Sequence, residues 1–325
     1  MSHHQDSTKP APVMRPTLRV KLAMWAFDLF PRVVSPDDES HAAFFEPSHL
    51  KHLVREKIDA ALHSAAHNRR LAEEQSPFLE PFFSPSIKEY FKGKRVLDFG
   101  SAIGGTAIAW EGMYETATVS GFDVTPIFVE GATKYAKSAD SAADFRHGYG
   151  EQSPFADGSF DTIVAIDVLE HVYDFEQCLR ECSRMLVQGG HLIAVFPPFL
   201  HPYEHHIKVS RTPFVHWIFS GETLRLALNE VLRRRGPQFA HFHAEHNPNY
   251  KIPDLNGITV RRARKAFRDQ GWVVVKNERH GVPKVGRRAQ TPLLRMISRV
   301  TSVFARVPLL DEVFLDRIAV VLRKA

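Results

Sequence analysis

From Lys94 onward, short apolar runs rich in β-branched residues alternate with stretches of helical periodicity. Five runs have the length and composition of strands: RVLDFG, TVSGFD, ADFRHG, FDTIVAID and HLIAVF. Between them, helices are predicted to start near Gly104, near Pro126 and after Asp174. GWVVVK and RIAVVLRK predict two further strands, with a helical segment around 291–316 between them. This alternation predicts a parallel sheet with helices on both faces.

The pattern before Lys94 is different. Residues 1–17 are polar and rich in Pro and His, and we expect them to be disordered. The next segment, LRVKLAMWAFDLFPRVV, is apolar with its basic residues near the start, so it predicts a helix that covers a cleft or rests on a bilayer; packing onto the protein is the commoner outcome. Apolar residues from Leu50 to Ala65 recur at helical spacing. Together these segments predict an N-terminal helical cap.

The composition is that of an ordinary globular chain. Of 325 residues, 44% are hydrophobic and 24% are charged, which excludes global disorder, collagen and a disulfide scaffold. Cys178 and Cys182 lie four residues apart on one face of a predicted helix, so we interpret them as reduced core thiols of a cytoplasmic chain. No apolar run approaches the ~20 residues of a membrane span, and the start lacks a secretory signal.

Charge is divided unevenly along the chain. Residues 1–200 carry 19 Lys and Arg against 27 Asp and Glu, whereas residues 201–325 carry 23 against 10. The basic half could face phosphate groups, an anionic membrane surface or nucleic acid, and solvated helix faces are the alternative interpretation. Nucleic acid is not expected, because no nucleic-acid-binding module accompanies the basic runs.

Small residues follow the first predicted strand and open a helix, in the run from Asp98 to Gly105. There, backbone N–H groups approach a ligand closely and the helix N-terminus offers partial positive charge, so a nucleotide-type ligand is implied. Asp98, which precedes the first glycine of the loop, would repel a pyrophosphate but attract a cationic ligand with an amino-acid tail. Asp123 ends the next strand, where an acidic residue accepts both hydroxyls of a ribose.

The downstream segment runs GYGEQSPFADGSFDTIVAIDVLEHVYDFEQCLRECSRMLVQGGHLIAVFPP. With it, residues 94–198 closely resemble the class I S-adenosylmethionine-dependent methyltransferases, in particular the type 11-like group with its Pro-Phe, Ser-Phe-Asp, Leu-Glu-His-Val and Gly-Gly motifs. The resemblance implies an α/β fold with a doubly wound, Rossmann-like seven-stranded sheet, an N-terminal helical cap and an insertion after strand five. It also implies a transferase that uses S-adenosyl-L-methionine. The expected units are 1–90 (tail and cap), 91–200 (cofactor-binding core), 201–270 (acceptor-side insertion) and 271–325 (strands six and seven).

The resemblance also implies roles for individual residues. Asp98 and the loop of Gly100, Ser101, Ala102 and Gly104 would hold the methionine part of the cofactor. Asp123, with Val124 beside it, would hold the ribose. Tyr149, Gly150 and Glu151 would lie near adenine, and Asp167 would lie near the sulfonium. Two positions depart from the family pattern. Ala102 replaces the usual middle glycine, which adds only a methyl group, and Tyr149 stands where an acidic residue is common.

Histidines gather directly after the fifth strand, where ligands bind in doubly wound folds: His201, His205, His206 and His216, with Glu204 among them. We expect His205 or His206 to act as a general base that Glu204 orients, with His201 also a candidate. A metal on His201, Glu204 and His205 is not expected, because Pro202 prevents one regular helix from carrying all three. His171 is expected to orient strand four or its loop, and a second cluster (His241, His243, His246) to lie at the pocket rim.

These features predict a methyltransferase that modifies a small-molecule, glycan or lipid-linked acceptor, at a hydroxyl oxygen, with contact to an anionic membrane as a further expectation. N- or C-methylation is the alternative within the same enzyme class, because the shared motifs describe only the cofactor half. Two interpretations come from other classes, namely an NAD(P)-dependent oxidoreductase, which Asp98 and the altered glycine spacing oppose, and a non-catalytic membrane-associated adaptor that uses the basic faces.

Overall fold

The computed structural model of the protein describes residues 16–32, 65–66, 69, 82–83, 86–237, 239, 243–282 and 292–325. Most of the helix predicted between Leu50 and Ala65, the tail and His241 therefore lie outside the described residues, although Ala65, Ala66 and Arg69 are helical.

A mixed sheet of seven strands forms the centre of the molecule, in the order β3-β2-β1-β4-β5-β7-β6. The strands are β1 (Arg95–Phe99), β2 (Thr118–Asp123), β3 (Asp144–His147), β4 (Phe160–Ile166), β5 (Leu186–Phe196), β6 (Val273–Glu278) and β7 (Ile318–Arg323). Strands β1 to β5 pair in parallel, and β7 pairs antiparallel with both β5 and β6. The predicted fold class is confirmed. One boundary differs, because β5 begins at Leu186 and absorbs the Gly-Gly turn expected before it.

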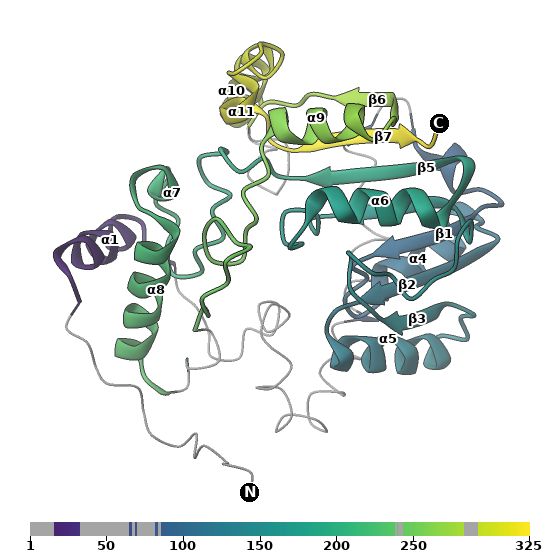
Figure 1. Cartoon of the computed structure of the whole chain (residues 1–325), viewed down its shortest axis with the longest axis horizontal. Helices are drawn as coiled ribbons and strands as arrows, with labels where there is room; N and C mark the ends of the chain where they lie inside the picture. The colour runs from purple at the N-terminus through teal and green to yellow at the C-terminus, as the bar shows by residue number, and fades with distance from the viewer. Residues whose placement is uncertain are drawn as a thin grey trace, which may run out of the picture.

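Helices cover both faces of this sheet (Figure 1). On one face, α4 (Gly105–Tyr114) and α5 (Pro126–Ser138) pack with the short 3₁₀ helix η3 (Lys88–Tyr90) in one apolar cluster. On the other face, α6 (Phe175–Met185) and α9 (Val260–Asp269) pack in a second cluster, which contains both free cysteines. Since the central strands are buried on both sides, their sequences read as continuous apolar runs rather than alternating ones.

Local signals place the starts of these helices. Pro126 occupies the first turn of α5 after Thr125, as predicted. Asp174 caps α6 by accepting a hydrogen bond from the Gln177 N–H at 2.9 Å. The reciprocal half of the predicted capping box is missing, because the Gln177 side chain donates instead to the Glu151 carbonyl at 3.2 Å. That bond ties the start of α6 to the loop after β3.

A separate helical unit lies beyond the carboxyl ends of the parallel strands, on the side toward which the arrowheads of β1 and β5 point (Figure 1). It consists of α1 (Leu18–Leu29), α7 (Val215–Ile218) and α8 (Gly221–Arg235), which share a third apolar cluster. Thr212 Oγ1 donates to the Ala26 carbonyl at 2.7 Å, and Ser210 Oγ donates to the Phe27 carbonyl at 3.1 Å. Thus α1 packs onto the protein, the commoner of its two predicted outcomes.

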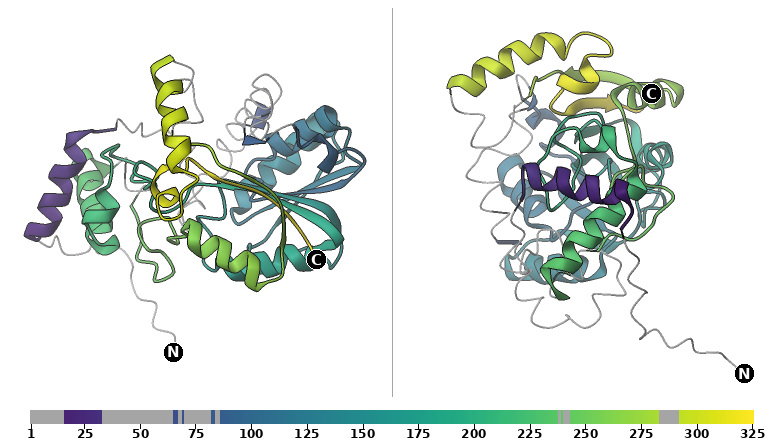
Figure 2. Two further views of the ribbon diagram at one scale, coloured as in Figure 1. Left: turned by 90° about the horizontal axis from the view of Figure 1, so that it is seen from above. Right: turned by 90° about the vertical axis from the view of Figure 1, so that its left-hand side faces the viewer.

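The C-terminal helical segment is divided into α10 (Pro292–Phe304) and α11 (Asp311–Phe314). Pro308, which lacks a backbone N–H, and Leu309, with a φ of 74°, end the first helix where a continuous one was predicted. Figure 2 shows α10 standing away from the sheet. Within the described part of the chain, no helix has the length and apolar character needed to cross a membrane.

Candidate active site

The loop after β1 is held in a conformation that suits glycine. Gly100 and Gly104 have φ values of 78° and 74°, and a Cβ on Gly104 would lie 2.6 Å from the Phe145 ring. Ala102 also has a positive φ, of 45°. Replacing the family's middle glycine therefore places an L-residue in the left-handed region, at a cost of about 1 kcal/mol. The change is more than the added methyl group that the sequence indicated.

Asp123 stabilises that loop. Its Oδ2 accepts a hydrogen bond from the Ala102 N–H at 2.9 Å, and its Oδ1 accepts one from the Thr125 N–H at 2.8 Å. The backbone carbonyl of Phe122 accepts from the N–H groups of Gly100 and Ser101. Burial raises the pKa of Asp123, and these backbone bonds oppose the shift. The carboxylate is thus fixed beside the loop, as expected for a ribose-binding group.

Asp98 is the penultimate residue of β1. It is in register with Gly121 of β2 and is only 7% exposed. Within the described residues, no hydrogen bond to its carboxylate is found. Burial, and next the charge of Asp123, raise the pKa of Asp98 to about 7. A buried carboxylate with this pKa is poised to gain from a cationic partner. Ser101 Oγ beside it is also buried and lacks a hydrogen-bond partner within the described residues.

Val124 follows β2, and the three residues expected near adenine follow β3, which is the adjacent strand. Val124 is 45% exposed, and its carbonyl contacts His147 Nε2 at 3.1 Å. Tyr149 is 46% exposed and lies edge-on to the His147 ring. The Glu151 carboxylate already has partners within the protein. Its Oε1 accepts hydrogen bonds from the backbone N–H groups of Tyr173 and Asp174, directly before α6. At Gly150, a Cβ would lie 2.8 Å from the Phe99 ring, so only glycine fits.

The N-terminal segment reaches the same loop. A Cβ on Gly105 would lie 2.2 Å from the Ala65 carbonyl oxygen, and Ala65 packs against Ile103. Ala65 and Arg69 therefore lie directly against the start of α4, next to the loop of Gly100 to Gly104.

Asp167 ends β4, adjacent to β1, and connects the two halves of the site. Its φ is 49°, and its Oδ1 contacts Arg317 Nε at 3.2 Å. Arg317 Nη1 in turn contacts Glu204 Oε1 at 3.3 Å. The guanidinium is 13% exposed, and it bridges a strand end to the loop after β5. Sequence reasoning missed Arg317; its only signal was its position at the start of the last predicted strand, directly before β7.

The predicted histidines of the loop after β5 differ in their exposure and in their contacts. His206 is partly exposed, and its Nε2 lies 3.5 Å from Glu204 Oε2. Burial would raise the pKa of Glu204, but the hydrogen bond to His206 and the charge of Arg317 outweigh it and lower that pKa. His201 and His205 are each 2% exposed, and burial lowers the pKa of each to about 4. Among the predicted bases, His206 is thus the one paired with Glu204.

His201, His205 and His216 bond to the backbone of their own loop. His201 Nδ1 accepts from the Tyr203 N–H at 3.2 Å, His205 Nδ1 accepts from the Ile207 N–H at 3.1 Å, and His216 Nε2 contacts the Phe199 carbonyl at 2.9 Å. These contacts hold the conformation of the loop. His243 and His246 of the second cluster lie elsewhere, His246 paired with Glu222 on α8 at 3.5 Å.

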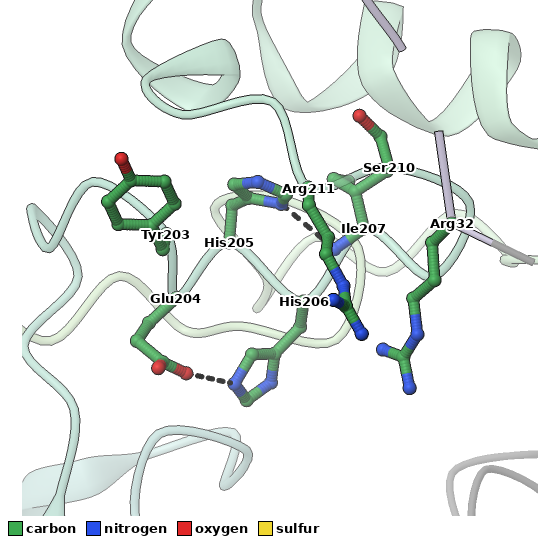
Figure 3. Close-up of a pocket in the computed structure, with 8 residues that line it drawn as sticks. All are labelled: Arg32, Tyr203, Glu204, His205, His206, Ile207, Ser210 and Arg211. Carbon is green, nitrogen blue, oxygen red and sulfur yellow. Dashed lines mark hydrogen bonds and ion pairs between the residues drawn. The ribbon is translucent and has the colours of Figure 1, made fainter. Parts of the chain in front are cut away.

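A cavity of about 280 Å³ opens beside this loop (Figure 3). Its lining is Arg32, Tyr203, Glu204, His205, His206, Ile207, Ser210 and Arg211. Arg32 follows α1, so the N-terminal helical unit contributes directly to the cavity. The backbone bonds from Arg32 N to the Val209 carbonyl and from Arg211 N to the Phe30 carbonyl join the two segments. The cavity thus combines two guanidinium groups with the Glu204–His206 pair.

A turn after β4, Leu169–Val172, lies against the same loop, with the ring centroids of His171 and His206 5.0 Å apart. Asn256 holds this turn: its Nδ2 donates to the carbonyls of Leu169 and Val172 at 2.8 and 2.9 Å, and its N–H donates to the Glu170 carbonyl. His171 Nδ1 contacts the Asp254 carbonyl at 2.6 Å, in agreement with the orienting role expected for it. Burial, and next the charge of His206, lower the pKa of His171 to about 3.

The turn also brings together a group of side chains that the sequence did not indicate. In the described residues, Glu170, His171 and His206 offer ligand atoms that lie within 4.8 Å of one another, a spacing that could hold a metal ion. His201, Glu204 and His205, the metal set weighed from the sequence, do not form such a group. Glu170 and His171 come from the turn after β4 and His206 from the loop after β5, so no local spacing along the chain indicates this group.

Part of the chain matches a known protein family. Residues 97–194 match the sequence model of a family described as a methyltransferase domain. This range contains most of β1, the glycine loop, Asp123, β4 and most of β5. Residues 97–194 are a class I S-adenosylmethionine-dependent methyltransferase domain. The match favours this interpretation over the oxidoreductase alternative.

Curated relatives of the methyltransferase domain act at different atoms. Norajmaline N-methyltransferase of Rauvolfia serpentina is 27% identical over 48% of this chain and 50% of its own length. Ubiquinone biosynthesis O-methyltransferase of Maricaulis maris is 32% identical over 34% of this chain and 43% of its own length. A solved structure of geranyl diphosphate methyltransferase with its cofactor covers 79% of this chain and 86% of that chain, at 18% identity and a TM-score of 0.48. The chain spans half or less of the length of these two curated relatives.

The residues present fit S-adenosylmethionine, the cofactor of this domain. A buried carboxylate without a hydrogen-bond donor suits an ammonium group, and a second carboxylate fixed beside a glycine loop suits a ribose. The orphaned Ser101 hydroxyl is a further polar group that a bound ligand could satisfy. Asp98, Ser101 and Asp123 are the side chains that would hold it.

Proposed function

We propose that this protein transfers the methyl group of S-adenosylmethionine to a hydroxyl oxygen of an anionic small-molecule, glycan or lipid-linked acceptor bound in the cavity of Arg32, Glu204, His206 and Arg211. The bound cofactor supplies an electrophilic methyl group on a sulfonium. The protein's task is then to align the acceptor, exclude water and handle the hydroxyl proton.

The observation that carries the proposal is the Glu204–His206 pair at the cavity wall. An amine acceptor needs little help once it is neutral, whereas a hydroxyl must lose its proton for transfer to proceed. A histidine backed by a carboxylate, itself anchored by Arg317, is the arrangement that handles such a proton. His206 is therefore the residue that activates the hydroxyl, and Glu204 orients it.

The charge of the cavity supports an anionic acceptor. Arg32 and Arg211 line it from two segments that are joined by backbone hydrogen bonds. Guanidinium groups bind carboxylates and phosphates through paired donors. The exposed Tyr203 ring adds a planar apolar surface at the same wall. An acceptor that carries an acidic group and a ring would contact Arg32, Arg211 and Tyr203.

The test compares hydroxyl and amine acceptors under one assay. The full chain is incubated with isotopically labelled S-adenosylmethionine and matched pairs of aromatic acids that carry either a hydroxyl or an amine. Products are identified by mass spectrometry as ethers or methylamines. We expect ethers from the hydroxyl acids; transfer to the amines alone would overturn the proposal in favour of N-methylation.

The same assay tests whether His206 activates the hydroxyl. His206→Ala should lower kcat by about 100-fold, in the range expected for an acid–base group, and leave the Kd for S-adenosylhomocysteine unchanged. The matched control is His246→Ala, which removes a histidine from the other His–Glu contact of 3.5 Å, on α8. Full activity of the His206→Ala protein would remove His206 from the chemistry.

A further inference from the structure

The strongest unexplained feature of the structure is a buried carboxylate behind the cavity. Glu170 is 2% exposed, and neither carboxylate oxygen has a hydrogen-bond partner within the described residues. Its backbone is held by Asn256, so the side chain cannot easily swing to solvent. An ionised carboxylate in such a place is unfavourable unless a cation compensates it.

The cations of this region are already used by other carboxylates. Arg317 contacts Asp167 at 3.2 Å and Glu204 at 3.3 Å. Lys208 Nζ lies 3.5 Å from Asp254 Oδ2. Within the described part of the chain, no ion pair from Lys or Arg to Glu170 is found. The carboxylates of Asp167 and Glu204, which are 35% and 26% exposed, thus share the Arg317 guanidinium, and the buried carboxylate of Glu170 leaves room for added positive charge.

Two imidazoles face Glu170. His171 Nε2 lies 3.8 Å from Glu170 Oε1, and the His171 and His206 ring centroids are 5.0 Å apart. Two ligand atoms bound to one tetrahedral zinc ion lie about 3.4 Å apart. The distance from His171 Nε2 to Glu170 Oε1 would therefore have to shorten by only a few tenths of an ångström. The ligand atoms of all three residues already lie within 4.8 Å.

The outer nitrogens of both rings are held by oxygen atoms. His171 Nδ1 contacts the Asp254 carbonyl at 2.6 Å, and His206 Nε2 contacts Glu204 Oε2 at 3.5 Å. A metal-binding histidine usually donates its other N–H to a carbonyl or a carboxylate, which fixes its tautomer and orientation. His171 Nε2 and His206 Nδ1 are then the nitrogens directed to an ion. Asp167, His206 and Asp254 also adopt left-handed backbone conformations, which cluster at functional sites.

We propose that Glu170, His171 and His206 bind one divalent transition-metal ion, Zn²⁺ or Mn²⁺, at the back of the acceptor cavity. Two imidazoles and one carboxylate are ligands for such ions rather than for Mg²⁺ or Ca²⁺, which prefer oxygen alone. Three protein ligands leave a coordination position open toward the cavity that His206 lines.

This inference rests on the proposed function and says how His206 activates the acceptor. The hydroxyl oxygen would occupy the open position, where the ion lowers its pKa and the proton is released to water. The oxygen then forms its bond to the methyl carbon while the bond from sulfur to that carbon breaks, and the sulfonium becomes a neutral thioether. His206 takes part as a ligand that Glu204 orients.

The test measures metal binding without donor or acceptor. Full-length protein is stripped with a chelator and titrated calorimetrically with ZnCl₂, MnCl₂ and MgCl₂, and the bound metal is counted by mass spectrometry after desalting. We expect one equivalent of Zn²⁺ or Mn²⁺ to bind in preference to Mg²⁺. Glu170→Gln should weaken that binding by about 100-fold, and Glu204→Gln, which removes only the outer hydrogen bond, by about 10-fold. His246→Ala should leave it unchanged.

Two readouts keep the outcome unambiguous. Co²⁺ substitution reports the ligand set, because its visible bands should shift in His206→Asn even where the protein stays folded by circular dichroism. Equal Zn²⁺ binding by wild type and Glu170→Gln, or a preference for Mg²⁺, would overturn the site. Ether formation by chelator-stripped protein at the full rate would overturn this inference alone, whereas metal binding without ether formation would overturn only the proposed function.

Discussion

The pKa of Asp98 makes cofactor affinity depend on pH. In the free protein, burial and the charge of Asp123 place this pKa at about 7, well above the ordinary value of 3.8. If Asp98 meets an α-ammonium group, only its ionised form binds well. That form is scarce at about pH 6 and prevails at about pH 8, so affinity should rise with pH. For a group that titrates near 7, the Kd for S-adenosylhomocysteine should fall ~10-fold over this interval.

Isothermal titration calorimetry at closely spaced pH values measures this effect, with S-adenosylhomocysteine as ligand because its ammonium group keeps its proton throughout. Proton uptake or release, read from buffers of different ionisation enthalpy, should show one proton leaving the protein on binding near pH 6. Asp98→Asn should bind more weakly with no pH dependence of this kind. Asp144→Asn, which changes an exposed carboxylate on β3, is the matched control and should retain the wild-type profile.

A flat profile for wild-type protein, together with weak binding by Asp98→Asn, would refute the electrostatic reasoning. Asp98 would then contribute through shape or a hydrogen bond alone. A profile of opposite sign, with affinity falling as pH rises, would mean that the protonated carboxyl group is the binding form.

Three further predictions concern affinity and stability. Asp123→Ala should raise the Kd for S-adenosylhomocysteine more than tenfold by calorimetry, because a hydrogen bond to a charged group contributes ~1.5–3 kcal/mol; unchanged affinity would place the ribose elsewhere. Arg317→Met should lower the free energy of unfolding in urea by about 2 kcal/mol, since it leaves the partly buried carboxylates of Asp167 and Glu204 without their guanidinium partner, and a loss below about 0.5 kcal/mol would contradict this. Asn256→Ala should cost about 2–3 kcal/mol in the same assay, because the carbonyls of Leu169 and Val172 lose their donor.

Local sequence signals account for the core of the fold. Runs of strand length predicted all seven strands. The central ones are apolar throughout because they are buried on both faces, whereas β3 and β6 are largely exposed. Pro126 and Asp174 marked helix starts correctly, since a missing N–H and a side-chain acceptor act within one turn. The cofactor half of the site was also accessible, because Asp98 and Asp123 end adjacent parallel strands and are brought together by the sheet itself.

The acceptor half depended on tertiary structure. Nothing in the pattern around Arg317 indicates that it joins Asp167 to Glu204, because the three residues are distant in sequence and meet only when β7 inserts beside β5. His171 looked like a fixed feature of the strand-four loop until the loop after β5 placed His206 against its ring. Sequence therefore determined the sheet and its methyl-donor groove through short-range pattern, whereas packing between distant loops decided which histidines share a site, because their contacts have no periodicity along the chain.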